Sequence, residues 1–190
     1  ADDPDTPLAD TMEAFSQLIR EGKVRVTGAS NYQADRLAEA LQLSASNGLA
    51  AYQTLQPEYN LYTRQDYETQ LGPLCTQYKL GVVPYYALAS GFLTGKYRSE
   101  ADFGKSRRGQ GIKKYLNDRG YKILDALDDV AERHQCSVAS VSLAWLMARP
   151  GITAPIASAT KVEQLDDLVK AADLKLNNED VELLNNASAY

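Results

Sequence analysis

Amide, hydroxyl and aromatic side chains follow four short segments that we expect to be β-strands. Ser30 ends the first segment with Asn31 directly after it, and Gln56 ends the second. Tyr85 and Tyr86 end the third segment, and Ser158 ends the fourth. Amides and hydroxyls can hydrogen-bond the edge of a planar carboxamide, while a tyrosine ring can stack on the attached heterocycle. The pattern therefore predicts a nucleotide-cofactor site at one end of a sheet.

A loop rich in small residues follows Tyr85. The stretch VVPYYALASGFLTGKY, residues 82–97, starts as an apolar strand and then supplies two glycines, a threonine and Lys96. Backbone amides of such a loop can approach a pyrophosphate closely, and a lysine adds positive charge. Residues 105–119 add further cations against Asp118 alone: Lys105, Arg107, Arg108, Lys113, Lys114 and Arg119. These cations indicate either a phosphate contact or a solvated loop.

Each of these residues also has a structural explanation. Asn31 is of a type that commonly caps helices, and Gln56 can satisfy buried backbone groups. Tyr85 taken alone is typical of an aromatic core residue. Only the joint placement at strand ends favours the binding interpretation.

A nucleophilic or metal site is not expected. His134, the single histidine, lies near Cys136, but no third group to orient the pair is evident, and a histidine at a helix C-terminus is the simpler interpretation. Cys75 and Cys136 lack the spacing of metal ligands, and two cysteines do not make a disulfide scaffold. Trp145 lies on an apolar helical stripe and is expected in the core.

The composition is that of a globular domain with an acidic balance. The 190 residues are 44% hydrophobic and 24% charged, with a formal net charge of −5. Broad nucleic-acid binding is not expected, because it needs a basic face. The sequence shows neither an apolar run of membrane-spanning length nor a leader, so we expect a cytoplasmic protein that does not bind membranes. No repeat or domain boundary is evident, and we predict a single domain over residues 1–190.

Strand and helix patterns alternate along the chain. Period-two or apolar segments predict four strands, at residues 23–30, 51–56, 82–86 and 152–158. Helical spacing predicts seven helices. The first is capped by Thr6 and closes at Gly22, the second runs over about 34–43 and stops at Asn47 and Gly48, and the third has a capping box of Thr63 and Asp66. The others are expected over 123–130, from 138 to Pro150, over 165–172, and after Asn177, with Asp180 supporting the last cap. Strands that alternate with helices in this way are parallel, which predicts an α/β fold.

Four motifs in this order resemble the aldo/keto reductase superfamily, especially its bacterial members and the related potassium-channel β-subunits. The motifs are GKVRVTGASNY, LQPEYNLYTR, VVPYYALASGFLTGKY and PIASATKVEQL. The resemblance covers essentially the whole chain. It implies a TIM-type (β/α)8 barrel that binds NADP(H) at the C-terminal ends of its strands.

The resemblance assigns a cofactor contact to residues in each motif. Ser30, Asn31 and Gln56 would hold the nicotinamide carboxamide, and Tyr85 would stack on the ring. The pyrophosphate would be lined by Tyr86, Leu88, Ala89, Gly91, Thr94 and Lys96, with Arg107 joining from the basic segment. The adenosine and its 2′-phosphate would lie near Ser158, Thr160, Gln164 and Asp167.

Two positions depart from the family pattern. Tyr86 stands where the family usually has serine, so the large ring is expected to crowd the groove and a small hydroxyl is lost. Leu168 stands where an asparagine commonly reads adenine, so that contact is expected to be missing.

The resemblance covers only the second half of the family barrel, about four βα units. In the family the acid-base tyrosine, its aspartate and lysine partners and the active-site histidine come from the first half, so no catalytic residue is assigned here. Four parallel strands leave unpaired edges. We expect a missing N-terminal half, or another copy of the chain, to cover them, and the abrupt start of the sequence favours the former.

The function expected from this resemblance is NADP(H)-dependent reduction of an aldehyde or ketone by direct hydride transfer. A nucleotide-sensing regulatory subunit with little turnover and an inactive half-barrel fragment remain alternatives. The identity of the carbonyl substrate and the oligomeric state do not follow from the sequence.

Overall fold

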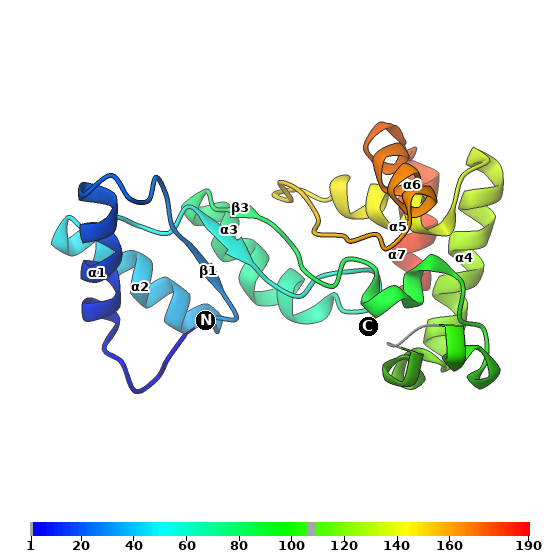
Figure 1. Ribbon diagram of the computed structural model, residues 1–190, viewed down its shortest axis with the longest axis horizontal. Coiled ribbons are helices and arrows are strands. Elements are labelled where there is room, and N and C mark those ends of the chain that lie inside the picture. Colours follow the sequence, from blue (N-terminus) through cyan, green and yellow to red (C-terminus); the bar gives the residue numbers. More distant parts are fainter. Residues whose placement is uncertain (1, 106–108) are drawn as a thin grey trace. The chain divides into compact units, whose positions relative to one another are not determined.

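A computed structural model describes residues 2–105 and 109–190, and the predicted contact of Arg107 lies outside them. The chain divides into two compact units (Figure 1). The first unit comprises Ala1–Pro57 and Asp66–Val83, and the second comprises Glu58–Gln65 and Pro84–Tyr190. None of the helices in these described parts has the length and hydropathy needed to cross a membrane.

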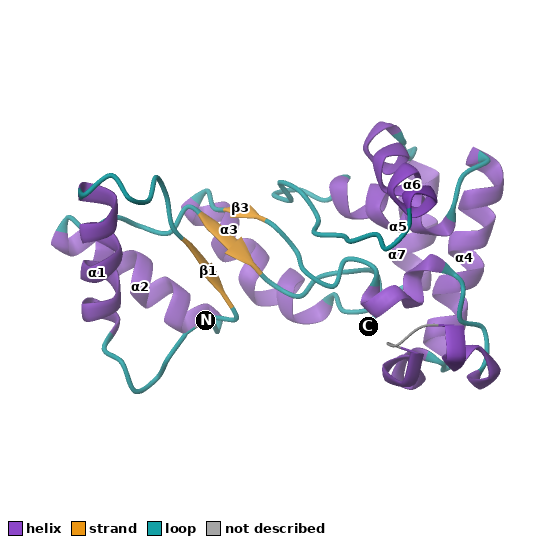
Figure 2. Cartoon of the chain, in the orientation of Figure 1, coloured by secondary structure: helices purple, strands orange, loops and turns teal. Residues whose placement is uncertain are grey.

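The first unit contains a three-stranded parallel sheet in the order β1-β2-β3 (Figure 2). The strands are β1 (Gly28–Ser30), β2 (Thr54–Gln56) and β3 (Gly81–Val82). The parallel arrangement confirms the mixed α/β character predicted from the alternation of helices and strands. All three strands are shorter than the periodicity predicted, although hydrogen bonds from Gln53 N to Thr27 O and from Val83 N to Leu55 O continue between them just beyond their ends.

One face of this sheet is buried and the other is not. Ala29, Leu55 and Val82 are at most 4% exposed and lie at successive positions across the three strands. Gly28 and Gln56, which point to the opposite face, are exposed. Because side chains alternate along a strand, the polar residues of β1 and β2 share the exposed face.

Three α-helices complete the first unit. They are α1 (Leu8–Arg20), α2 (Ala34–Asn47) and α3 (Gly72–Tyr78). The prediction that Thr6 caps the first helix is wrong: Pro7 is the N-cap, and the Thr6 hydroxyl donates to Asp3 instead. Helix α2 ends as expected, at Gly48 in the left-handed conformation that glycine adopts without strain.

The segment before α3 forms differently from the predicted capping box. Thr63 Oγ1 donates to Glu58 Oε1, and Asp66 makes no side-chain cap. A π-helical turn, Tyr67–Leu71, comes first, and α3 then starts at Gly72 with Pro73 in its first turn. Proline is accepted there because the first helical amides have no partner within the helix.

Four helices dominate the second unit, namely α4 (Asp118–His134), α5 (Val138–Met147), α6 (Val162–Asp173) and α7 (Asn178–Ala187). Three 3₁₀ segments precede them, at Ala89–Thr94, Glu100–Lys105 and Gly109–Tyr115. The Asn177 side-chain oxygen accepts from the backbone N–H of Asp180, and the backbone N–H of Asn177 donates to the Asp180 carboxylate. The predicted cap of the last helix is therefore confirmed. Trp145 is fully buried on α5, as predicted.

The predicted strand at residues 152–158 is wrong. This described segment forms no strand beyond a single bridge residue at Ile152. Its main-chain hydrogen bonds include those from Ile152 N to Arg149 O at 3.3 Å and from Ile156 N to Pro84 O at 2.8 Å. Pro155 and Pro84 have no N–H to donate, so each removes a donor that a ladder between this segment and β3 would need. Apolar composition alone could not reveal this loss of ladder hydrogen bonds.

Candidate functional site

The carboxyl ends of β1 and β2 bring three of the predicted residues together. Ser30 and Gln56 are register partners, and Ser30 Oγ donates to Gln56 O at 3.0 Å. The Gln56 side chain is exposed, and Asn31 follows Ser30 directly. Hydroxyl and amide groups therefore lie at one edge of the sheet, where parallel α/β proteins bind ligands.

Asn31 has an unusual backbone conformation. Its φ is +56°, a left-handed value that asparagine adopts more readily than most residues. Helix α2 starts after Gln33, which is its N-cap, so the alternative that Asn31 caps the helix is wrong. The turn at Asn31 instead ends β1 sharply and leaves its side chain exposed.

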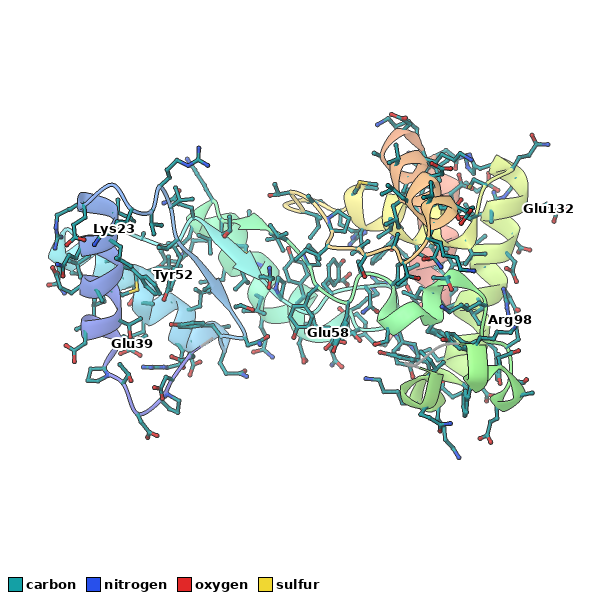
Figure 3. The ribbon with its side chains drawn as sticks, in the orientation of Figure 1. Lys23, Glu39, Tyr52, Glu58, Arg98 and Glu132 are labelled. Atoms are coloured by element: carbon teal, nitrogen blue, oxygen red, sulfur yellow. The ribbon has the colours of Figure 1, made fainter. Side chains whose placement is uncertain are left out.

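Tyr85 lies in the second unit and is half-buried. Its backbone pairs in parallel with Glu58, labelled in Figure 3, through an isolated bridge. Burial raises the pKa of the Tyr85 phenol, and the nearby Glu58 and Tyr86 add to the shift. A phenol is already neutral near pH 7, and this shift keeps the Tyr85 ring neutral at higher pH as well, which suits a ring that stacks.

Tyr86 presents its ring to solvent. The side chain is 50% exposed, and its ring centroid lies 5.2 Å from that of Tyr85 at an interplanar angle of 68°. The Tyr86 backbone has a φ of +52°. Its carbonyl oxygen accepts from Asn60 Nδ2 at 3.0 Å. Asn60 was not predicted as a site residue, because a left-handed φ at a tyrosine leaves no signal in the sequence.

The loop after Tyr86 is built from consecutive left-handed residues. Ala89, Ser90 and Gly91 have φ values of 46°, 58° and 98°. A Cβ added to Gly91 would lie 3.5 Å from Lys96 Cε and 3.6 Å from Lys96 Nζ, so the lysine packs directly over the glycine. Thr94 Oγ1 closes the turn by donating to Gly91 O at 2.8 Å. Residues 89–96 thus combine an irregular backbone with a positive charge.

Other cations of the basic segment have partners of their own. Lys105 Nζ donates to Lys96 O at 2.9 Å and pairs with Asp102 at 2.8 Å. Lys113 pairs with Glu100 at 3.2 Å. Arg119 donates to three backbone carbonyls, those of Tyr62, Ser188 and Ala189. Among the described cations, Lys96 and Lys105 thus lie next to the glycine loop, while Arg119 supports the C-terminal segment.

The residues predicted near the adenosine form a local group at the start of α6. Gln164 Oε1 accepts from Thr160 N at 2.9 Å and from Thr160 Oγ1 at 3.2 Å. Ser158 is exposed on the extended segment before them. Asp167 is half-exposed, and its backbone carbonyl accepts from Ser140 Oγ at 2.8 Å. Thr160 and Gln164 are therefore in contact, whereas Asp167 joins α6 to α5 through its backbone.

His134 and Cys136 form no nucleophile and base pair. His134 Nε2 donates to Asp180 Oδ2 at 2.7 Å near the C-terminal end of α4. Burial, followed by the charge of Asp167, raises the pKa of the Cys136 thiol. A neutral thiol is a poor nucleophile, so the geometry supports the structural interpretation of both residues.

Comparison with known proteins identifies the class. A sequence model described as the Aldo/keto reductase family matches residues 1–189, and the chain therefore belongs to that family. It is 35% identical over 184 residues to the aldo-keto reductase str7 of Strobilurus tenacellus, covering 94% of this chain and 53% of the relative. It is 30% identical over 179 residues to a probable voltage-gated potassium channel subunit beta of Arabidopsis thaliana, covering 90% and 54%.

A solved structure gives the same relationship. The chain is similar to a thermostable aldo-keto reductase crystallised with the inhibitor epalrestat, with a TM-score of 0.76 and 26% sequence identity. The match covers 97% of this chain and 56% of that one. The chain therefore spans about half the length of these relatives.

Proposed function

We propose that the chain is the cofactor-binding half of an NADP(H)-dependent oxidoreductase that reduces aldehydes or ketones by direct hydride transfer. The observation that carries the proposal is the gathering of Ser30, Asn31 and Gln56 at the carboxyl edge of the β1–β2 pair. Family membership supports the reaction class. In this proposal residues 1–190 correspond to the C-terminal four βα units of a TIM-type barrel, and the acid-base residues lie in the other half.

The donor set fits a nicotinamide. Bound NADPH supplies the hydride, and the chain holds and orients the ring. Amide and hydroxyl groups of Ser30, Asn31 and Gln56 match the donor and acceptor edge of a carboxamide. The half-buried, neutral ring of Tyr85 is a suitable stacking surface, because burial disfavours its ionisation.

The glycine loop fits a pyrophosphate. Left-handed residues at 89–91 turn successive backbone groups in directions that regular helices do not allow. Gly91 leaves room for Lys96 to pack over the loop, so a cation accompanies the backbone amides. In this proposal the pyrophosphate is lined by Tyr86, Leu88, Ala89, Gly91, Thr94 and Lys96.

The start of α6 fits the far end of the cofactor. Thr160 and Gln164 already contact each other there, and Ser158 is exposed beside them. Leu168 is half-buried and apolar, so it supplies no polar contact to an adenine. Preference for NADPH over NADH would then depend on hydroxyl and cationic groups that contact the 2′-phosphate, and not on a residue that hydrogen-bonds the adenine.

The exposed face of the sheet supports the proposal that another segment completes a barrel. The side chain of Gln56 is exposed while Leu55, on the opposite face, is 1% exposed. Strand β1 is an edge of the described sheet. An N-terminal half of the barrel, or a second copy of the chain, would cover this edge and this face. We further propose a cytoplasmic location, which the free thiols of Cys75 and Cys136 support.

A second candidate is a nucleotide-sensing subunit that binds NADP(H) with little turnover. The relatives named as potassium channel subunits favour it, because they match the chain over a similar length as those named as reductases. An inactive half-barrel is the third alternative. The two cofactor-binding candidates share the site and differ in catalysis.

Titration of the intact protein with NADPH and NADH, followed by nicotinamide fluorescence, tests the shared site. NADPH is expected to bind more tightly than NADH, and Tyr85→Ala is expected to weaken NADPH binding about fivefold to tenfold through loss of stacking. Tyr121→Ala is the matched control, because Tyr121 is an exposed tyrosine on α4 that no predicted contact involves. Absence of NADPH binding would refute the site, and steady NADPH consumption with aldehydes or ketones separates the reductase from the sensor.

A further inference from the structure

Tyr86 is held in a conformation that its side chain does not favour. Its φ of +52° lies in the left-handed region, where a residue with a Cβ is strained. Such strain persists only where the surroundings impose it, and it concentrates at ligand sites. The ring is 50% exposed, so we look for the constraint in the contacts of the Tyr86 backbone.

Asn60 supplies that constraint. Its side chain is fully buried, and Nδ2 donates to Tyr86 O at 3.0 Å. Its Oδ1 accepts from Tyr62 N and from Thr63 N, both at 2.8 Å. The oxygen of the amide thus fixes the turn at residues 60–63, and the nitrogen ties that turn to Tyr86.

The same turn also fixes the neighbouring tyrosine. Glu58 pairs with the backbone of Tyr85, and its carboxylate accepts from Thr63 Oγ1 at 3.2 Å. Both tyrosines are therefore anchored to residues 58–63, one through a backbone bridge and the other through the Asn60 amide. The bridge at Tyr85 and the hydrogen bond to the Tyr86 carbonyl hold the backbone on both sides of the Tyr85–Tyr86 peptide, and this restricts the direction of the Tyr85 ring.

We propose that Asn60 is a positioning residue that orients the Tyr85 ring for stacking on the nicotinamide by locking the left-handed backbone of Tyr86. The inference rests on the proposed function, because it explains how the ring that is proposed to stack on the nicotinamide is held in place. Asn60 does not touch the cofactor. Its loss is therefore expected to weaken binding of ligands that carry the nicotinamide ring more than binding of ligands that lack it.

The variant Asn60→Asp isolates the bond to Tyr86. Asp keeps an oxygen for the two amides of the turn but replaces the donor nitrogen with an oxygen that repels the Tyr86 carbonyl. In the intact protein we expect NADPH to bind about tenfold more weakly, as for one lost hydrogen bond. 2′-Phospho-ADP-ribose lacks the nicotinamide but shares the pyrophosphate, and its affinity is expected to fall by no more than about threefold, less than that of NADPH.

Two further comparisons separate positioning from folding. Asn177→Asp makes the same chemical change at a residue whose side-chain oxygen caps α7, and it should leave both affinities unchanged. Tyr86→Asn and Tyr86→Val both remove the ring, but asparagine tolerates a left-handed φ and valine does not. The valine variant is expected to bind NADPH about tenfold more weakly than the asparagine variant, even if Asn60→Asp does not fold.

The outcomes distinguish this inference from the proposed function. If the unmodified protein binds neither ligand, the proposed cofactor site is wrong. If it binds both, and Asn60→Asp weakens both equally or neither, Asn60 has no positioning role and the cofactor site stands. Equal NADPH affinities of the valine and asparagine variants at position 86 would likewise overturn the inference.

Discussion

His134 and Asp180 join the end of α4 to the start of α7, with His134 Nε2 donating to Asp180 Oδ2 at 2.7 Å. The Asp180 side chain is 1% exposed and also accepts from Asn177 N at 3.2 Å. Arg133 NH1 lies 2.9 Å from the other carboxylate oxygen. One buried carboxylate thus caps a helix and holds a second helix against it.

The free energy of unfolding is expected to depend on pH through this carboxylate. Burial would raise the pKa of Asp180, but the hydrogen bonds from His134 and Asn177 and the charge of Arg133 hold that pKa below its usual value. A carboxyl with a lowered folded pKa stabilises the fold above its unfolded pKa, and this stability is lost as the pH falls through the folded value. We expect the free energy of unfolding, measured with urea, to fall below about pH 4. Asp180→Asn should remove part of that slope and cost about 1–3 kcal/mol at pH 7.

The matched control is Asp128→Asn. Asp128 also pairs with an arginine, Arg98, at 2.6 Å, but both side chains are at least 40% exposed. Exposed pairs contribute about 0–1 kcal/mol, so this variant should keep the acid slope of the unmodified protein. A slope that persists in Asp180→Asn would show that other carboxylates cause it.

Arg64 is expected to stabilise the second unit through packing as well as charge. It is 8% exposed, lies 5.3 Å from the Trp145 ring, and donates to Asn185 O and Ser188 Oγ. Arg64→Ala should lower the free energy of unfolding by about 2–3 kcal/mol, because both the stacking and charged hydrogen bonds are lost. Urea unfolding followed by circular dichroism measures the change.

The control for Arg64 is a surface arginine. Arg20 pairs with Glu13 at 2.6 Å, and both side chains are more than half exposed. Arg20→Ala is expected to cost at most about 1 kcal/mol. Equal losses in the Arg20 and Arg64 variants would contradict the structural role assigned to the buried arginine.

Local patterns predicted the helices better than the strands. The cap at Asn177 and the end of α2 at Gly48 depend on neighbouring residues only, and both follow the prediction. The strand expected at 152–158 depends on hydrogen bonds to distant segments, and a proline in its middle removes a donor. Strand length is therefore decided by partners that an apolar pattern does not identify.

The candidate site divides in the same way. Placement at strand ends predicted that Ser30 and Gln56 would meet, and they are register partners. The role of Asn60 was missed, because it depends on the backbone conformation of Tyr86 and on a turn between them. Only glycine, and to a lesser degree asparagine, signals a left-handed residue in a sequence.

Gly91 is expected to be required in the loop next to Lys96. Its φ of +98° is strained for any L side chain, and an added Cβ would contact Lys96 Cε at 3.5 Å. Gly91→Ala should reduce the free energy of unfolding by about 1–2 kcal/mol and weaken NADPH binding in the intact protein. Gly104→Ala is the control, because an added Cβ there meets no atom within 4 Å. Loss of NADPH affinity in both variants would indicate a general effect on the fold.

Gly28 is expected to be required where β1 meets β2. A Cβ at Gly28 would lie 2.1 Å from Thr54 Oγ1, closer than real Cβ atoms approach other atoms, and 3.1 Å from the backbone oxygen of Thr54, a tight contact. Gly28→Ala should therefore lower the free energy of unfolding by about 2–3 kcal/mol through overpacking.

The double variant Gly28→Ala with Thr54→Ala tests whether this contact is the cause. Removing Oγ1 relieves the closest clash but leaves the backbone oxygen at 3.1 Å, so rescue should be partial. The double variant is expected to be at least about 1 kcal/mol more stable than the sum of the single losses predicts, since residues in contact are coupled. If the losses in the free energy of unfolding simply add, the two strands separate to accept the new side chain. The close approach of β1 and β2 would then not be the reason for glycine at position 28.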